Sequence, residues 1–279
     1  MDVSDLTERR LEATDADHLL ALTEEARWNQ TIADWRFMLA NGSGWGLWTA
    51  SGMPVASTLI VPYPPRFAWI SMVLVSAPWR RLGLATRLTR LCLEDLQRLS
   101  LAPMLDASEA GRGVYEKLGF KALWTFDRMV AETPKRPAPT LPVRPLALTD
   151  LASVANFDAK TFGARRDAML AYCCDDQAPY ATILEDRGGF ALGRDGQRTL
   201  HIGPVMARDA ASAASLVAAS LAGTSGPVSI DVPTKHADFR AALADMGFSP
   251  QRPFVRMTTA AEDFGDPSHC YAVAGPEFG

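Results

Sequence analysis

The sequence predicts an α/β protein whose two halves resemble each other, each with a sheet flanked by helices. Residues 55–61 and 68–75 are rich in β-branched and aromatic side chains, which is typical of strands. From Gly83 to Leu99 the leucines recur at steps of three to five residues, which predicts an amphipathic helix lying on a sheet. A strand followed by a helix, and the same order again further along the chain, is typical of a layered α/β fold.

A proline-rich segment divides the chain near its middle. The protein has 279 residues, which is enough for about two ordinary domains. Between residues 131 and 145 five prolines occur with almost no apolar pattern, and this predicts an extended connector. We therefore expect a first domain at 1–131, a linker at 132–142 and a second domain at 143–279.

Short motifs recur at matching places on both sides of this linker. In each half a Gly-Phe pair is followed nine residues later by an Arg-Met pair, at Gly119-Phe120 with Arg128-Met129 and at Gly247-Phe248 with Arg256-Met257. Each half also starts with an Arg that precedes a Thr-Asp pair, and this pair predicts a helix N-terminus. In addition, each half has an Asp in a strand-like run that precedes the Gly-Phe pair. These residues are Arg10, Thr14, Asp15 and Asp106 in the first half and Arg144, Thr149, Asp150 and Asp231 in the second. We interpret the two sets as a duplicated fold.

The overall composition excludes several kinds of partner. Apolar residues make up 48% of the chain and charged residues 22%, which is the composition of a soluble globular protein. The net charge is −4 and no dense Lys/Arg block occurs, so neither nucleic acid nor a membrane is expected as a partner. The chain shows no signal peptide or spanning run, and its four sparse cysteines fit a reducing cytoplasm. The four histidines are scattered, so no metal site is expected.

One segment has the chemistry of an anion-binding site. An apolar strand ending at residues 73–75 leads through a short loop with Arg80 and Arg81 into the helix that starts near Gly83. The first N–H groups of a helix lack partners within the helix, so they can hold a phosphate together with the helix dipole. Small residues at Gly83 and Ala85 would let a phosphate approach the backbone closely.

The string Arg80-x-x-Gly83-x-Ala85 resembles the pyrophosphate-binding motif of the GNAT superfamily of N-acetyltransferases, and residues 115–120 resemble its later helix-and-strand motif. The resemblance covers residues 9–130 well and 143–258 more weakly, which implies a tandem protein with a degenerate second domain. It also implies a mixed sheet in which two parallel strands splay apart to admit the arm of acetyl-CoA, the expected cofactor. The residues that it places around the cofactor are Val73, Leu74, Val75, Arg80, Arg81, Leu82, Gly83, Leu84, Ala85 and Thr86.

The resemblance further implies that the acyl group passes directly to an amine, without a covalent enzyme intermediate. Tyr115 matches the position of a tyrosine near the cofactor sulfur in many family members, so we expect it to donate a proton to the leaving thiolate. Its alternative role is to pack on its helix. Asp106, at a strand end, is the candidate base, and its alternative role is structural, as a partner of the following loop or a cap of the helix near Gly111.

The acceptor is expected beside the segment between the first two helices. In this fold that segment usually borders the substrate, which makes Trp28, Gln30 and Trp35 candidates for binding it. Ordinary helix packing explains the two tryptophans equally well. The expected partner is a small-molecule amine or a peptide, because acceptor specificity depends on pocket shape. The alternative function is that of a non-catalytic acyl-CoA sensor or interaction module.

The second half lacks the features that define the cofactor site. When the Gly-Phe pairs are aligned, Leu243 stands where the first half has Tyr115. The matching strand-to-helix turn has no counterpart of Gly83, and Asp209 is expected to cap its helix and repel a phosphate. We therefore expect the second half to complete the acceptor pocket or an interface rather than bind cofactor. The C-terminal carboxylate of Gly279 is a further candidate for the base.

Overall fold

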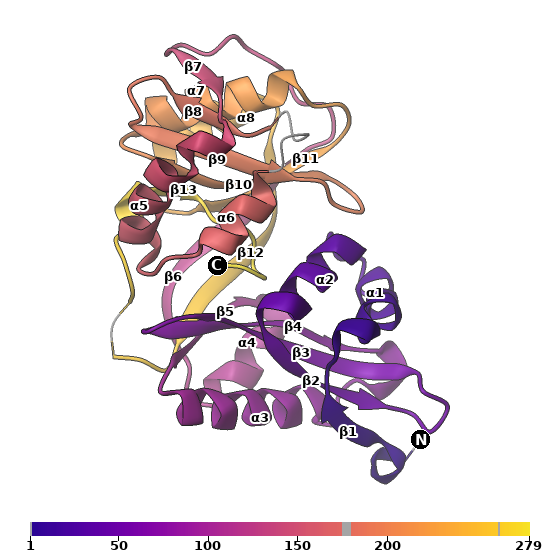
Figure 1. Cartoon of the computed structure of the whole chain (residues 1–279). Helices are drawn as coiled ribbons and strands as arrows, with labels where there is room; N and C mark the ends of the chain where they lie inside the picture. Colours follow the sequence, from indigo (N-terminus) through magenta and orange to yellow (C-terminus); the bar gives the residue numbers. More distant parts are fainter. Residues whose placement is uncertain (1, 175–179, 262) are drawn as a thin grey trace.

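The chain folds into two halves with the same order of helices and strands. The computed structural model describes residues 2–174, 180–261 and 263–279. The elements of the first half are β1 (Thr7–Arg10), α1 (Ala16–Glu25), α2 (Ile32–Asn41), β2 (Ser43–Trp48), β3 (Pro54–Tyr63), β4 (Phe67–Val75), α3 (Leu84–Leu99), β5 (Ala102–Ser108), α4 (Glu109–Glu116) and β6 (Lys121–Ala131). In Figure 1, α1 and α2 lie on one face of the sheet and α3 lies on the other.

The second half repeats this order and adds one short strand. Its elements are β7 (Val143–Pro145), α5 (Leu151–Phe162), α6 (Asp167–Cys173), β8 (Thr182–Leu184), β9 (Gly189–Arg194), β10 (Leu200–Ala207), α7 (Ala210–Ala222), β11 (Val228–Pro233), α8 (Ala237–Asp245), β12 (Ser249–Thr258) and β13 (Cys270–Ala272). The strands at 55–61 and 68–75, the helix after Gly83 and the duplicated order are confirmed.

All the described strands belong to one continuous mixed sheet (Figure 1). Along it the strands follow the order β1-β2-β3-β4-β5-β12-β6-β11-β10-β9-β8-β7, and β13 pairs with β10. The pairs β4–β5 and β10–β11 are parallel, whereas β12 and β6 run antiparallel at the centre. The mixed α/β class predicted from the sequence is therefore confirmed.

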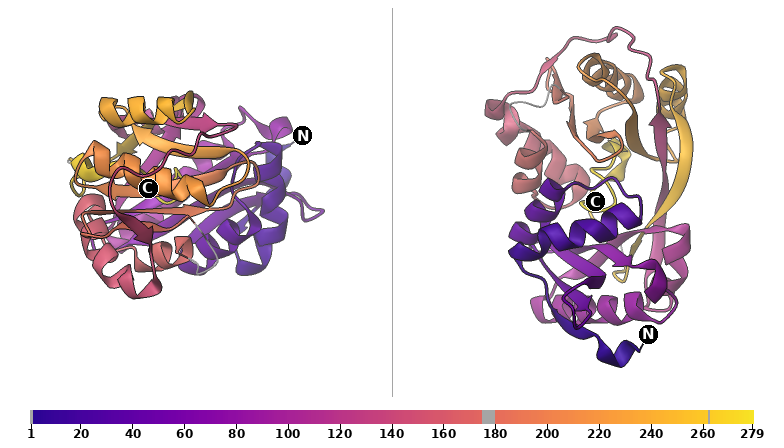
Figure 2. Two further views of the ribbon diagram at one scale, coloured as in Figure 1. Left: turned by 90° about the horizontal axis from the view of Figure 1, so that it is seen from above. Right: turned by 90° about the vertical axis from the view of Figure 1, so that its right-hand side faces the viewer.

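The last strand of each half lies on the sheet of the other half. β12 inserts between β5 and β6, and β6 pairs with β11, so the two long strands run side by side between the halves (Figure 2). The boundaries expected at 1–131 and 143–279 follow the sequence repeat, but the spatial halves differ from them. The reason is that residues 121–131 complete the second sheet and residues 249–258 complete the first.

Two buried ion pairs connect these exchanged strands to the neighbouring strands of the sheet. Arg256 on β12 donates hydrogen bonds from Nε and Nη2 to the two carboxylate oxygens of Asp106 on β5, both at 2.9 Å. Arg128 on β6 binds Asp231 on β11 in the same way, at 2.8 and 2.7 Å. Each repeated arginine therefore pairs with the repeated aspartate of the other half, which the sequence motifs did not indicate. Bidentate geometry compensates the cost of burying these charges.

A second pair of ion pairs repeats at the start of each half. Arg9 donates to both carboxylate oxygens of Asp15 at 2.8 Å, and Arg144 holds Asp150 at 2.7 and 2.8 Å. The alignment of Arg10 with Arg144 was therefore wrong by one position, since Arg10 pairs with a carboxylate of α3 instead. Both aspartates stand at the N-terminus of the first helix of their half, as predicted.

The C-terminal tail is packed into the centre of the molecule. Phe278 is fully buried and its ring meets that of Phe37 edge-on, with the centroids 5.6 Å apart. Tyr63 Oη donates to the backbone oxygen of Phe278 at 2.9 Å, and Trp69 Nε1 donates to that of Pro276 at 3.0 Å. The tail thus joins an apolar core to which α1, α2, α5 and α6 all contribute.

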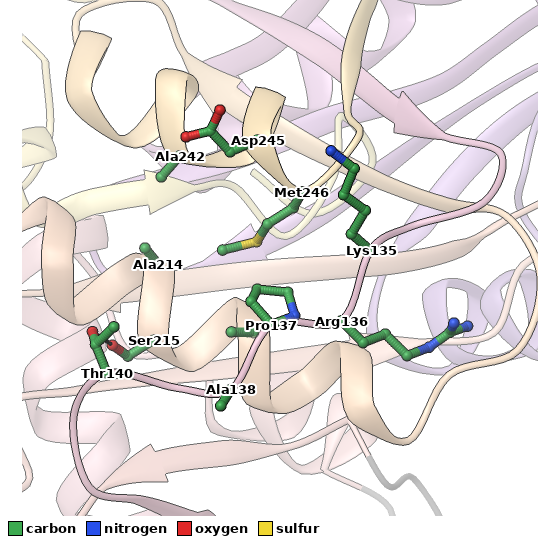
Figure 3. Close-up of a pocket in the computed structure, with 11 residues that line it drawn as sticks. Lys135, Arg136, Pro137, Ala138, Thr140, Ala214, Ser215, Ala242, Asp245 and Met246 are labelled. Atoms are coloured by element: carbon green, nitrogen blue, oxygen red, sulfur yellow. Dashed lines mark hydrogen bonds between the residues drawn. The ribbon is translucent and has the colours of Figure 1, made fainter.

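The linker runs over the outside of the second half. Arg136 donates hydrogen bonds to the backbone oxygens of Leu221 and Thr224, at 3.2 and 3.0 Å. Between the linker and helices α7 and α8 lies a pocket of about 530 Å³, into which Pro137 and Met246 project (Figure 3). Residues 132–142 contain no helix or strand.

Candidate active site

Strands β4 and β5 pair only over their first residues and then diverge. The parallel register joins Phe67 to Ala102 and Trp69 to Met104, and it does not continue toward the carboxyl ends. β4 is irregular just beyond that point, where Met72 has a φ of +50° and its carbonyl accepts a hydrogen bond from Ser57 Oγ at 2.8 Å. A bulge of this kind bends a strand away from its neighbour. The splayed strands implied by the family resemblance are confirmed.

A cavity of about 630 Å³ opens where the strands diverge. Nine of the residues expected from the sequence lie in its wall: Val73, Leu74, Val75, Arg80, Ala85, Asp106, Tyr115, Trp28 and Gln30. The other walls come from β6, β12 and the C-terminal tail. The cavity therefore combines residues from both halves of the chain.

One end of the cavity is formed by the turn into α3. Arg81 and Gly83 both have positive φ values, 64° and 80°, and these reverse the chain so that the helix points its N-terminus at the cavity. Among the described residues, no group accepts a hydrogen bond from the backbone N–H groups of residues 82–86. A Cβ on Gly83 would meet nothing within 4 Å, so the glycine is required by its conformation and not by a lack of space. Arg80 Nε donates to the carbonyl of Val75 at 3.0 Å, which holds this arginine at the cavity wall.

Tyr115 lines the cavity and packs in the core beside it. It lies on α4, is 9% exposed, and packs edge-on against Phe120 with the ring centroids 6.0 Å apart. Burial raises the pKa of its hydroxyl, and the Cys92 thiol adds to this shift. Within the described part of the chain nothing hydrogen bonds to that hydroxyl. The side chain therefore packs on its helix, as the structural alternative predicted. It also lines the cavity, as a role as proton donor would require.

Asp106 also lies in the wall, but both its oxygens are occupied by Arg256. The pKa of its carboxyl is raised to about 6, mainly because the group is buried. Arg256 lowers this pKa, whereas the carboxylates of Asp231 and Asp263 raise it. Asp231, the equivalent residue, has a lowered pKa although burial opposes this, because Arg128 and Arg252 both lie near it. The structural partner of Asp106 is neither the following loop nor a helix N-terminus, as the sequence suggested, but a strand from the other half.

The acceptor side of the cavity includes two of the three residues expected there. Trp28 and Gln30 lie in its wall, between α1 and α2. Trp35 does not line the cavity; it is fully buried, and its indole N–H donates to Thr23 Oγ1 at 2.7 Å. Its position on the first turn of α2 points it into the core, so for this residue the helix-packing alternative holds.

Four charged residues of the wall were not expected from the sequence: Glu109, Arg128, Arg252 and Glu277. Arg128 belongs to the repeated Arg-Met motif, so the sequence repeat singled out this residue but did not predict that it lines the cavity. Arg252 has no comparable signal, because only the exchange of β12 brings it to the first half. Glu277 arrives with the tail, two residues before Gly279. Gly279 itself lines a separate, smaller cavity, and its carbonyl accepts a hydrogen bond from Arg166 at 2.7 Å, so it is not the carboxylate of this site.

The matching turn of the second half is closed by its own side chain. Asp209 accepts a hydrogen bond from the backbone N–H of Ser212 at 2.8 Å, which confirms that it caps α7. Leu243, the counterpart of Tyr115, is fully buried in the core. The anion-binding geometry of α3 is therefore not repeated at α7.

The fold and the site define an acyltransferase with two similar halves. Among the described residues, β4 and β5 diverge beside an unpaired helix N-terminus, whereas in the second half β13 pairs with β10 and Asp209 caps α7. Residues 7–120 match the model of the Acetyltransferase (GNAT) family, and residues 154–272 match that of an Acetyltransferase (GNAT) domain. The two matches together cover most of the sequence. The chain belongs to the GNAT superfamily and is an acetyltransferase of the tandem type.

Several known proteins resemble this chain along most of its length. The chain is 26% identical over 239 residues to the Uncharacterized N-acetyltransferase YitH of Bacillus subtilis, covering 82% of this chain and 83% of the relative. A putative acetyltransferase of Pyrococcus horikoshii superimposes with a TM-score of 0.84 at 20% identity, covering 100% of this chain and 98% of that one. A tandem GNAT protein from the clavulanic acid biosynthesis pathway gives a TM-score of 0.65 at 13% identity, with 92% and 100% covered.

The described residues contain no group of three or more His, Cys, Asp or Glu side chains arranged to hold a metal ion. None of the described helices has both the length and the apolar character needed to cross a membrane.

Proposed function

We propose that this protein transfers the acetyl group of acetyl-CoA directly to an amine acceptor, which is a small molecule or a peptide. The observation that supports this most strongly is the splay of β4 from β5 beside the unpaired N–H groups at the start of α3. The residues fit coenzyme A, because a diphosphate needs such amides and a pantetheine arm needs a free strand edge. Coenzyme A would supply an activated thioester.

The backbone of the cavity wall binds the donor in this proposal. The N–H groups of residues 82–86 hold the diphosphate, and Arg80 adds positive charge beside them. The free edge of β4 at residues 73–75 orients the arm that leads to the thioester. Both sets of donors are fixed by secondary structure, so little reorganisation is needed at the moment of reaction.

Two side chains move protons in the proposed reaction. Tyr115 donates its phenolic proton to the departing thiolate, since its raised pKa keeps it protonated at neutral pH. Glu277 accepts the proton of the acceptor amine, because its Oε2 has no hydrogen-bond partner among the described residues. Asp106 was the earlier candidate for this role; with both oxygens on Arg256 we assign it the positioning of β12 instead.

A carboxylate placed in the first turn of α3 is expected to abolish donor binding without unfolding the protein. Ala85→Asp should weaken coenzyme A binding at least about 100-fold, since two unit charges 4 Å apart repel by about 4 kcal/mol near a protein surface. The melting temperature should stay unchanged or rise, because an acidic residue in the first turn of a helix is worth about 0.3–1 kcal/mol. Calorimetric titration with coenzyme A measures the first effect and thermal unfolding the second.

The matched control is Ala211→Asp, at the same position of α7 in the second half. It should leave coenzyme A binding unchanged. Equal binding by the Ala85→Asp variant and the wild type would remove the basis of the proposal. A non-catalytic acyl-CoA sensor would show the same binding pattern, but acetyl-CoA would release no thiol with any amine.

A further inference from the structure

Three buried polar atoms in the cavity wall have no hydrogen-bond partner within the described parts of the chain. They are Arg252 Nε, Glu277 Oε2 and Gln30 Oε1, and all three side chains line the same cavity. Buried polar groups are almost always paired, so each unpaired group calls for an explanation. One donor and two acceptors on three side chains that line one cavity suit a ligand that carries both an anionic group and an N–H group.

Arg252 is a cation that forms no ion pair within the described residues, although it lies near the carboxylate of Asp231. It stands opposite Arg128 in the register of β12 and β6, and Arg128 is already held by both oxygens of Asp231. No carboxylate of the described residues forms an ion pair with Arg252; its nearest specific contact is the ring of Phe254, 4.8 Å from the guanidinium carbon. The two guanidinium groups of Arg128 and Arg252 therefore share the single carboxylate of Asp231, which leaves one positive charge unbalanced in this partly buried group.

The electrostatics of Arg252 agree with this geometry. Burial and, after it, repulsion from Arg128 lower the pKa of Arg252 to about 10, against the attraction of Asp231. An arginine normally stays far above that value. An anion beside Arg252 would offset both unfavourable effects by its attraction to the guanidinium, so the position of this charge suits an anionic ligand.

The acceptor oxygens come from two other segments. Glu277 is 2% exposed and ion-paired through Oε1 with Arg194, which fixes its side chain and leaves Oε2 free. Gln30 is 6% exposed, and its backbone oxygen accepts a hydrogen bond from Gln197 Nε2 at 2.7 Å, which fixes the loop that carries it. Both oxygens suit an ammonium or amine donor.

We infer that the acceptor is an amine that also bears a carboxylate, of the chemical class of free amino acids. Its carboxylate binds the guanidinium of Arg252, and its amino group faces Glu277 and Gln30, with Trp28 and Phe254 beside the carbon skeleton. This inference rests on the proposed function, because the ammonium must lose a proton to Glu277 before the nitrogen forms its bond to the acetyl carbon and the thiolate leaves. It assigns Arg252 the role of a specificity-determining residue.

The test compares matched acceptors that differ in the anion alone. Each of the common amino acids is assayed for thiol release from acetyl-CoA beside its carboxamide, with aminoalkyl phosphates as a third set. Charge-assisted hydrogen bonds predict that kcat/KM is about 10- to 100-fold higher for the best acid than for its amide. In Arg252→Gln this preference should fall to within about threefold, through loss of activity on the acid, with coenzyme A affinity unchanged.

Two controls separate binding from folding. Arg252→Gln should melt at or above the wild-type temperature, because it removes an unpaired charge next to Arg128; a large fall would assign Arg252 to the structure instead. Arg90→Gln makes the same chemical change on an exposed face of α3 and should alter neither preference nor stability.

A binding measurement tests the inference even if none of the acceptors is acetylated. With coenzyme A present, N-acetyl amino acids should bind the wild type more tightly than their amides in calorimetry, and this difference should vanish in Arg252→Gln. Equal affinity for acids and amides would overturn the inference while leaving the acyltransferase proposal intact. Preference for the phosphates would also overturn it, and failure to bind coenzyme A would instead overturn the proposed function.

Discussion

Replacing Tyr115 by phenylalanine is expected to lower kcat about 100- to 10,000-fold, the range found for loss of a positioned general acid. The ring should keep its place against Phe120, so the affinity for coenzyme A should stay within about twofold of the wild type. Because burial raises the pKa of this phenol, its ionisation should cause no fall in kcat below about pH 10. Steady-state thiol release and calorimetry with coenzyme A measure the two effects.

The control for this variant is Tyr180→Phe, which removes a hydroxyl from the second half outside the cavity wall. It should change kcat by less than about twofold. If Tyr115→Phe retained full kcat with unchanged coenzyme A affinity, Tyr115 would be a packing residue, and another group would have to protonate the thiolate.

Removing Arg256 is expected to produce the largest loss of stability among the ion-pair residues. Its guanidinium holds both oxygens of Asp106 and lies over the rings of Trp69 and Trp124, at 4.5 and 4.3 Å. Arg256→Met leaves a buried carboxylate without a partner, which costs about 3–5 kcal/mol. Urea unfolding followed by tryptophan fluorescence should show this loss as a lower midpoint.

A double variant tests the cause of that loss. In Arg256→Met with Asp106→Leu neither charge remains, so most of the lost stability should return. The exposed pair of Arg112 and Glu116 on α4 serves as the control, because breaking it should cost no more than about 1 kcal/mol. A double variant as unstable as Arg256→Met alone would show that packing against the tryptophans, and not the charge, is what matters.

The features that the sequence predicts correctly are those encoded locally. Hydrophobic spacing located β3, β4 and α3, and the glycine and arginines before α3 located the strand-to-helix turn. The repeat of Gly-Phe and Arg-Met marked the two equivalent strands, and the cap at Asp209 followed from residue type alone. Each of these depends on neighbours within about a turn of helix or a single strand.

The features that could not be predicted depend on contacts between distant segments. The repeat shows that β6 and β12 are alike, but pairing either strand with β5 preserves the same alternation of apolar residues. Only the three-dimensional fold assigns β12 to the first sheet, and with it Arg252 to the cavity. Glu277 is placed by Arg194 and by the burial of Phe278, neither of which leaves a local pattern.

The crossing of β6 and β12 has a consequence for how the enzyme is made. During synthesis the ribosome releases residues 1–131 long before β12 exists, so the nascent first half has an unpaired edge at β5. The wall of its cavity is complete only after residues 249–277 emerge, since these carry both the missing strand and Glu277. Neither half expressed by itself should therefore be active, and co-expressed fragments should regain activity only by trading these strands.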